Sequence, residues 1–128
     1  MQHSISIVKY FNTIPLLYGI EQSMTPSELK IVKEPPSGCA EKLFNNEVDI
    51  GLIPVGALYQ HGKYFEAGDF CIGTNGKVLT VNIYSNCPID EITELYLDHD
   101  SRTSNLLVQI ITTQFLSLSI KFLSPERG

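Results

Sequence analysis

The chain has 128 residues, of which 43% are hydrophobic and 18% are charged, and its formal net charge is −5 at pH 7. This composition is typical of a soluble globular domain that is long enough to bury a core. It disfavours nucleic-acid binding, and no apolar run approaches the ~20 residues of a membrane-spanning helix.

The cysteines and the first residues indicate the compartment. Cys39, Cys71 and Cys87 are odd in number and widely spaced, which is typical of buried thiols rather than of disulfides or a zinc site. Residues 1–8 lack the basic region and apolar block of an export signal. We therefore expect a cytoplasmic protein that binds neither nucleic acid nor membrane.

The first half of the chain alternates predicted strands and helices. Residues 4–8 alternate small polar and β-branched side chains, which predicts a strand. Pro15 favours a helix over residues 14–18, with Thr13 as its N-cap and Gly19 as its stop. A strand over residues 29–32, a helix capped by Ser37, an apolar strand over residues 49–53 and a helical turn over residues 55–60 follow. This alternation favours an α/β fold with parallel strands.

The second half begins differently. Residues 69–73 and 77–84 look like strands joined by a turn at Thr74, Asn75 and Gly76, and the missing helix between them indicates a crossing between two lobes. A strand over residues 93–97, a long helix after Ser101 and a strand over residues 120–123 complete the chain. We expect the helix to bury the stripe Leu107, Ile110, Ile111, Gln114 and Phe115.

Candidate binding residues follow from this order, because ligands of open α/β sheets bind beyond the carboxyl ends of the strands. Ser101, Arg102, Thr103 and Ser104 offer three hydroxyls and a guanidinium within one helical turn, which suits a carboxylate. The alternative is that Ser101 caps the helix and Arg102 is solvated. Asn12 and Thr13 offer an amide and a hydroxyl, or form an ordinary helix cap.

Other chemistry finds little support in the sequence. Asp98, His99 and Asp100 look like metal ligands, but no second cluster completes a coordination set, so we expect no metal. Phosphate-binding loops, dinucleotide fingerprints and the nucleophile elbow of hydrolases do not occur. The residues therefore point to a cofactor-free site that is built from amides, hydroxyls and helix ends.

Five separated segments resemble one known family. They are residues 10–16 (Tyr-Phe-Asn-Thr-Ile-Pro-Leu), Pro36-Ser37 with residues 40–43, residues 47–55, residues 71–78 and residues 97–104. In this order they resemble the chorismate dehydratases of menaquinone biosynthesis by the futalosine pathway. The resemblance covers nearly the whole chain.

The resemblance implies a fold of the type 2 periplasmic-binding-protein class, a three-layer α/β architecture with a mostly parallel sheet and a substrate cleft between two lobes. Residues 1–73 would form the first lobe, and residues 74–128 the crossing segment and the start of the second. Because family members run further, we expect both lobes to be incomplete. Exposed sheet edges and apolar helix faces then favour a homodimer.

The resemblance also implies an activity, the loss of water from chorismate to give 3-[(1-carboxyvinyl)oxy]benzoate without metal or organic cofactor. Asn12 would be catalytic, and the substrate would contact Thr13, Ser37, Thr74, Asn75, Gly76, Ser101, Arg102, Thr103 and Ser104. The chain departs from the family at Lys9, usually Ser, and at Ile14, usually Lys, which removes a positive charge near the cleft. Two other hypotheses stay open: a small-carboxylate binding module of the same fold, and a non-catalytic, self-associating fragment.

Overall fold

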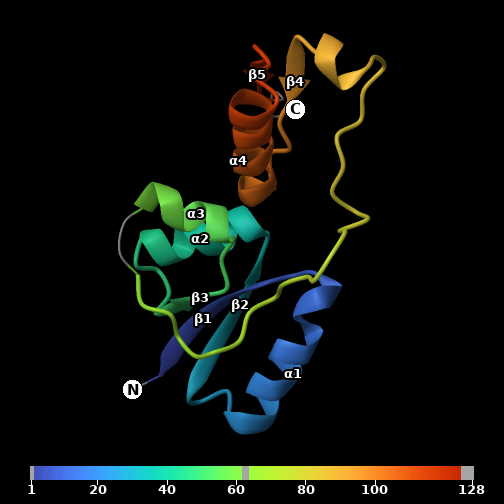
Figure 1. The fold of residues 1–128 in the computed structure, drawn as a ribbon. Helices are drawn as coiled ribbons and strands as arrows, with labels where there is room; N and C mark the ends of the chain where they lie inside the picture. The colour runs from blue at the N-terminus through green and yellow to red at the C-terminus, as the bar shows by residue number, and fades with distance from the viewer. Residues whose placement is uncertain (1, 62–63, 125–128) are drawn as a thin grey trace. The chain divides into compact units, whose positions relative to one another are not determined.

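A computed structural model describes residues 2–61 and 64–124, and its chain divides into two compact units, Met1–Gly73 and Thr74–Gly128 (Figure 1). Each unit has a parallel sheet of its own. The predicted α/β class, with parallel strands that alternate with helices, is confirmed. The assignment of the two units to two lobes of one binding fold stays a prediction.

Unit 1 contains a three-stranded parallel sheet. Its strands are β1 (His3–Val8), β2 (Leu29–Glu34) and β3 (Ile50–Gly51), in the order β2-β1-β3. The central strand β1 pairs with β2 from His3↔Leu29 to Val8↔Glu34 and with β3 at Ile5↔Ile50 and Ser6↔Gly51. The backbone N–H of Leu52 donates to the Ser6 carbonyl at 2.8 Å, so the pairing continues past the short third strand.

The helices of unit 1 lie on the two sides of this sheet (Figure 1). The 3-10 turn η1 (Phe11–Thr13) leads into α1 (Ile14–Ser23) on one side, while α2 (Pro36–Phe44) packs across all three strands on the other, followed by α3 (Val55–His61). The core lies under α2, where Cys39 and Ala40 are fully buried. There the buried Ser6 hydroxyl donates to the Cys39 carbonyl at 3.2 Å.

Two predicted helix boundaries in unit 1 are wrong. Helix α1 continues past Gly19 to Ser23. The Ser23 hydroxyl donates to the Gly19 carbonyl at 2.7 Å, and this hydrogen bond stabilises the last turn of the helix. Helix α2 begins at Pro36 with Pro35 at its N-cap, so Ser37 is not the cap. Proline suits the first helical position because its missing N–H would have no partner there.

Unit 2 contains a two-stranded parallel sheet. Its elements are η2 (Ile89–Glu91), β4 (Glu94–Tyr96), α4 (Arg102–Ile110), the π-helical turn η3 (Ile111–Phe115) and β5 (Lys121–Leu123). Strand β4 pairs with β5 from Glu94↔Lys121 to Tyr96↔Leu123. The predicted strand, long helix and strand are therefore confirmed. No helix among the described residues is long and apolar enough to cross a membrane.

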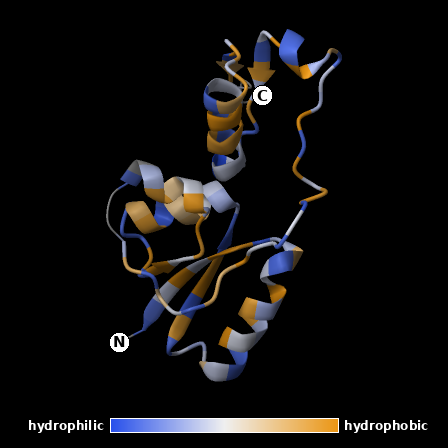
Figure 2. Cartoon of the chain, in the orientation of Figure 1, coloured by the Kyte–Doolittle hydropathy of each residue, from blue (hydrophilic) through white to orange (hydrophobic). Residues whose placement is uncertain are grey.

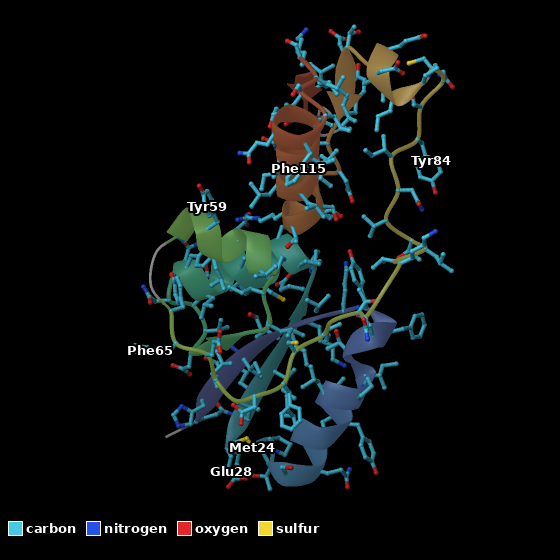
Figure 3. The ribbon with its side chains drawn as sticks, viewed as in Figure 1. Met24, Glu28, Tyr59, Phe65, Tyr84 and Phe115 are labelled. Atoms are coloured by element: carbon cyan, nitrogen blue, oxygen red, sulfur yellow. The ribbon has the colours of Figure 1, made fainter. Side chains whose placement is uncertain are left out.

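The strands predicted over residues 69–73 and 77–84 do not form. Every side chain described from Tyr64 to Glu91 is exposed, and residues 64–88 form neither helix nor strand. Figure 3 shows the side chains of Phe65 and Tyr84 extending away from this coil. A strand needs a hydrogen-bonding partner, and this segment pairs with none of the described strands. The chain does bend at Asn75 and Gly76, where Gly76 has a φ of 108°.

The predicted buried stripe of the long helix is also wrong. Leu107, Ile111, Gln114 and Phe115 are exposed and Ile110 is half-buried; Figure 2 shows that α4 carries hydrophobic residues along its length. Thr112 is buried instead, and its hydroxyl donates to the Val108 carbonyl at 2.8 Å. Two strands of three residues each are too short to cover a helix of nine residues.

Candidate functional site

The strand order of unit 1 indicates which end of the sheet to examine for a binding site. From β1 the chain runs through α1 to β2, and then through α2 to β3 on the other side of β1. The loops after β1 and β3 therefore leave the sheet toward opposite faces and flank a topological switch point, the usual place for a ligand in an open α/β sheet. These loops are residues 9–13 and 52–54.

A pocket of about 180 Å³ lies at the carboxyl end of β1 within unit 1. Its wall combines apolar side chains with two lysines and a threonine, and the lining residues are Ile7, Val8, Lys9, Tyr10, Phe11, Thr13, Ile14, Leu17 and Lys33. Sequence reasoning missed Lys9 and Lys33 as pocket residues. The alternation of side chains along β2 and its pairing with β1 place Lys33 beside Ile7. The pairing register is known only once the fold is known, so the sequence alone could not place Lys33 in the pocket.

Thr13 is the most informative residue of this pocket. Its side chain is 2% exposed, and its Oγ1 atom is buried with no hydrogen-bond partner among the described residues. Thr13 occupies the N-cap position of α1, but its αR backbone (φ −86°, ψ −16°) continues the η1 turn and its hydroxyl caps nothing. A buried hydroxyl without a partner costs about 1–3 kcal/mol. Because buried polar groups almost always have a hydrogen-bond partner, this hydroxyl is the candidate of unit 1 for pairing with a bound molecule.

Asn12 lies in the same 3-10 turn as Thr13. It is exposed to solvent and is not among the residues that line the pocket. The turn is closed by the Thr13 N–H, which donates to the Tyr10 carbonyl at 3.0 Å. The structure therefore brings the two predicted residues together at the end of β1, but of the two only Thr13 lines the pocket.

Ser37 lies in the first turn of α2, directly after β2, and is half-buried. The neighbouring Cys39 is fully buried, and its thiol donates to the Glu34 carbonyl at 3.8 Å. Burial raises the pKa of the Cys39 thiol above its ordinary value. Cys39 therefore stays protonated and serves the packing of α2 on the sheet.

In unit 2 a compact hydrogen-bonded loop precedes α4. Asp98 accepts hydrogen bonds from the Ser101 hydroxyl at 2.5 Å and from the Asp100 N–H at 3.1 Å, and its own carbonyl accepts from the Asn105 amide at 2.6 Å. The Ser101 and Asp100 bonds lower the pKa of Asp98. Ser101 holds the N-cap position, but its hydroxyl is used by Asp98 rather than by the helix. The sequence did not predict that Asp98 would accept the hydrogen bonds that hold this loop together.

The remaining predicted site residues lie in the same unit. Arg102, Thr103 and Ser104 form the first turn of α4 and are half-buried, while Thr74, Asn75 and Gly76 are exposed at the beginning of the unit. His99 Nδ1 lies 2.9 Å from Asp100 Oδ1. Within residues 2–61 and 64–124, no three His, Cys, Asp or Glu side chains gather in a way that would hold a metal ion.

These observations define an α/β protein of parallel strands with a small polar and apolar pocket at the carboxyl end of its central strand. A family model described as menaquinone biosynthesis matches residues 3–126. The chain therefore belongs to the menaquinone biosynthesis family. This family includes enzymes of that pathway and implies a small-molecule substrate.

Proposed function

We propose that the chain acts in the conversion of chorismate to 3-[(1-carboxyvinyl)oxy]benzoate, as a carbon-oxygen lyase of menaquinone biosynthesis. Family membership supports the pathway. The observation that carries the proposal is Thr13, which lines the pocket at the carboxyl end of β1 and whose buried hydroxyl has no hydrogen-bond partner among the described residues. The proposal includes a fold like the type 2 periplasmic-binding proteins, with residues 1–73 in the first lobe and 74–128 as the crossing and the start of the second.

The proposed reaction requires the protein to orient the substrate and to stabilise developing charge. A ring proton and the hydroxyl of the neighbouring carbon leave together as one molecule of water, and the ring becomes aromatic. Atoms and electrons balance without any oxidant or reductant. The site then has to hold the ring in one orientation and stabilise the charge that develops as the carbon-oxygen bond breaks.

The proposed roles follow from what each residue offers. The Asn12 amide would hydrogen-bond the reacting ring substituents from the turn that carries Thr13. The hydroxyls and helix ends at Thr13, Ser37, Ser101, Thr103 and Ser104, with Arg102 and the turn at Thr74, Asn75 and Gly76, would hold carboxylates, because local donors outweigh a remote net charge of −5. A substrate carboxylate or a bound water would accept the ring proton.

The test is to incubate the protein with chorismate, follow the aromatic product by ultraviolet absorbance, and measure binding heat in parallel. We expect product from the wild type and at least a 100-fold lower rate from Asn12→Ala, since loss of a transition-state hydrogen-bond donor costs about that much. Asn45→Ala is the matched control, because Asn45 lies at the other end of α2 from Ser37. Circular dichroism checks the folding of both variants.

The outcomes separate the three hypotheses. Product that disappears with Asn12→Ala supports the lyase. Heat without product favours the small-carboxylate binding module of the same fold. Neither heat nor product contradicts both and leaves the self-associating fragment.

The proposal also includes a homodimer. Unit 2 exposes large apolar side chains along α4 and η3, among them Leu107 at 52% and Phe115 at 76%. Apolar helix surface of this kind is stabilised when a second chain covers it.

A further inference from the structure

The pocket at the end of β1 carries more positive charge than the proposed chemistry has so far used. Resting on the proposed function, we infer that this pocket binds the ring of the substrate together with its ring carboxylate, with Lys9 and Lys33 as the pair of cations that recognise the carboxylate. The ligand class is a six-membered ring that bears one carboxylate.

The sheet register places both lysines on one face. Lys33 of β2 pairs with Ile7 of β1, and paired residues of parallel strands point to the same side. Lys9 follows Ile7 by two residues, and its N–H donates to the Glu34 carbonyl at 3.1 Å, so the alternation of β1 extends to it. Ser6 points to the opposite face, where it bonds to Cys39 of α2. Lys9, Ile7 and Lys33 therefore share the face that α2 does not cover.

Neither Lys9 nor Lys33 forms an ion pair with another of the residues that the structure describes. Lys42 provides the contrast, because its ammonium lies 3.6 Å from Glu34 and 3.2 Å from Glu47. Lys9 lies two residues beyond the β1 partner of Lys33, so the two lysine backbones are separated by about 4.8 Å between the strands and about 6.6 Å along them. Two ammonium groups on flexible four-carbon stems can therefore reach one carboxylate at the pocket.

The rest of the pocket fits a ring. An apolar cavity of roughly 150 Å³ is known to accommodate benzene. The pocket of about 180 Å³ thus has room for one six-membered ring between apolar side chains such as Ile7, Ile14 and Leu17. Thr13 lines the same pocket, and its buried hydroxyl, which has no hydrogen-bond partner among the described residues, is a neutral donor that a ligand can pair with.

The test uses the full chain and two small probes of nearly the same shape, anionic benzoate and neutral benzamide, in calorimetric or NMR titrations. We expect saturable benzoate binding that is at least tenfold tighter than benzamide binding and that weakens as salt is added. Lys9→Gln and Lys33→Gln should each weaken benzoate binding about tenfold, as expected when a charge-assisted hydrogen bond is lost. Lys30→Gln on the same strand β2, outside the pocket lining, is the control and should bind like the wild type.

Equal affinity for benzoate and benzamide, or Lys9→Gln and Lys33→Gln variants that bind like Lys30→Gln, would overturn the inference. The comparison of the two probes uses the wild type, so it does not depend on the folding of any variant. Chorismate conversion without selective benzoate binding sinks this inference and leaves the proposed function standing. Selective benzoate binding without conversion supports the inference and counts against the lyase.

Discussion

At the scale of single residues, Thr13 separates a structural role from a binding role. Thr13→Val removes the hydroxyl and keeps the shape of the side chain. Because the Oγ1 atom is buried without a partner, we expect the free energy of unfolding to stay the same or rise by about 1 kcal/mol. Binding of benzoate or chorismate should weaken several-fold. Urea unfolding and titration measure the two effects separately.

Thr112→Val is the matched control for this variant. Thr112 is 1% exposed, and its hydroxyl donates to the carbonyls of Val108 at 2.8 Å and Gln109 at 3.2 Å. Its replacement should lower the free energy of unfolding by about 1 kcal/mol. A Thr13→Val variant that loses as much stability as Thr112→Val would show that the Thr13 hydroxyl has a structural partner.

The three cysteines should differ sharply in reactivity. Cys39 is fully buried and burial raises its pKa, whereas Cys71 and Cys87 are exposed. Because only the thiolate is nucleophilic, iodoacetamide at pH 8 should modify Cys71 and Cys87 in the folded protein and Cys39 only after denaturation. Peptide mass spectrometry measures each site. Modification of Cys39 at the rate of the other two in the folded protein would contradict its burial on the face of α2 that packs on the sheet.

Residue types alone predicted part of the pocket. A strand followed by Asn12, Thr13 and a proline-started helix predicted polar groups at the end of β1, because these signals are local. The departure at Ile14 suggested a loss of positive charge near the cleft. The structure places Lys9 and Lys33 in the pocket wall, and that placement depends on the pairing of β1 with β2, which no local pattern contains.

At the scale of elements, two glycines test how α1 and α2 are packed. A Cβ on Gly51 of β3 would lie 3.1 Å from Leu43 Cβ of α2 and 3.1 Å from Ile53 Cγ2, while a Cβ on Gly19 of α1 would meet nothing within 4 Å. We expect Gly51→Ala to lower the free energy of unfolding by about 1–3 kcal/mol through overpacking. Gly19→Ala should raise it by about 0.5–1 kcal/mol, because alanine favours the helix interior.

Denaturant unfolding of the two variants, each followed by circular dichroism, checks this prediction. Opposite signs are the expected result. A Gly51→Ala variant as stable as the wild type would mean that α2 does not pack closely on β3.

The elements also show which signals a sequence carries. Strand β1 was predicted from its alternation of small polar and β-branched residues, and β2 and α2 were predicted because proline or asparagine also marks where they end. The strands over residues 69–73 and 77–84 were not realised, although their composition favours strands, because a strand is completed only by a neighbour. Gly19 did not stop α1, since glycine costs a helix only about 1 kcal/mol.

At the scale of the whole molecule, the sequence predicted the family and the parallel α/β class, which the family match and the sheets confirm. The burial of the long helix was predicted wrongly. An amphipathic pattern states which face is apolar and does not state what covers it. In unit 2 the covering surface is missing from the described elements, so the apolar face of α4 and η3 stays exposed.

The proposed homodimer can be tested on this face. Replacing Leu107 and Phe115 with lysine in one variant should remove apolar area from any interface and place two positive charges in it. In sedimentation experiments we expect the average mass of the wild type to rise toward that of a dimer with concentration, and the double variant to stay near the monomer. Tyr84→Lys, an exposed position in the coil, is the control and should associate like the wild type. Because the substituted side chains are exposed, circular dichroism should be unchanged in both variants. A wild type that sediments as a monomer at every concentration would contradict self-association, and a dimer that survives in the double variant would place its interface elsewhere.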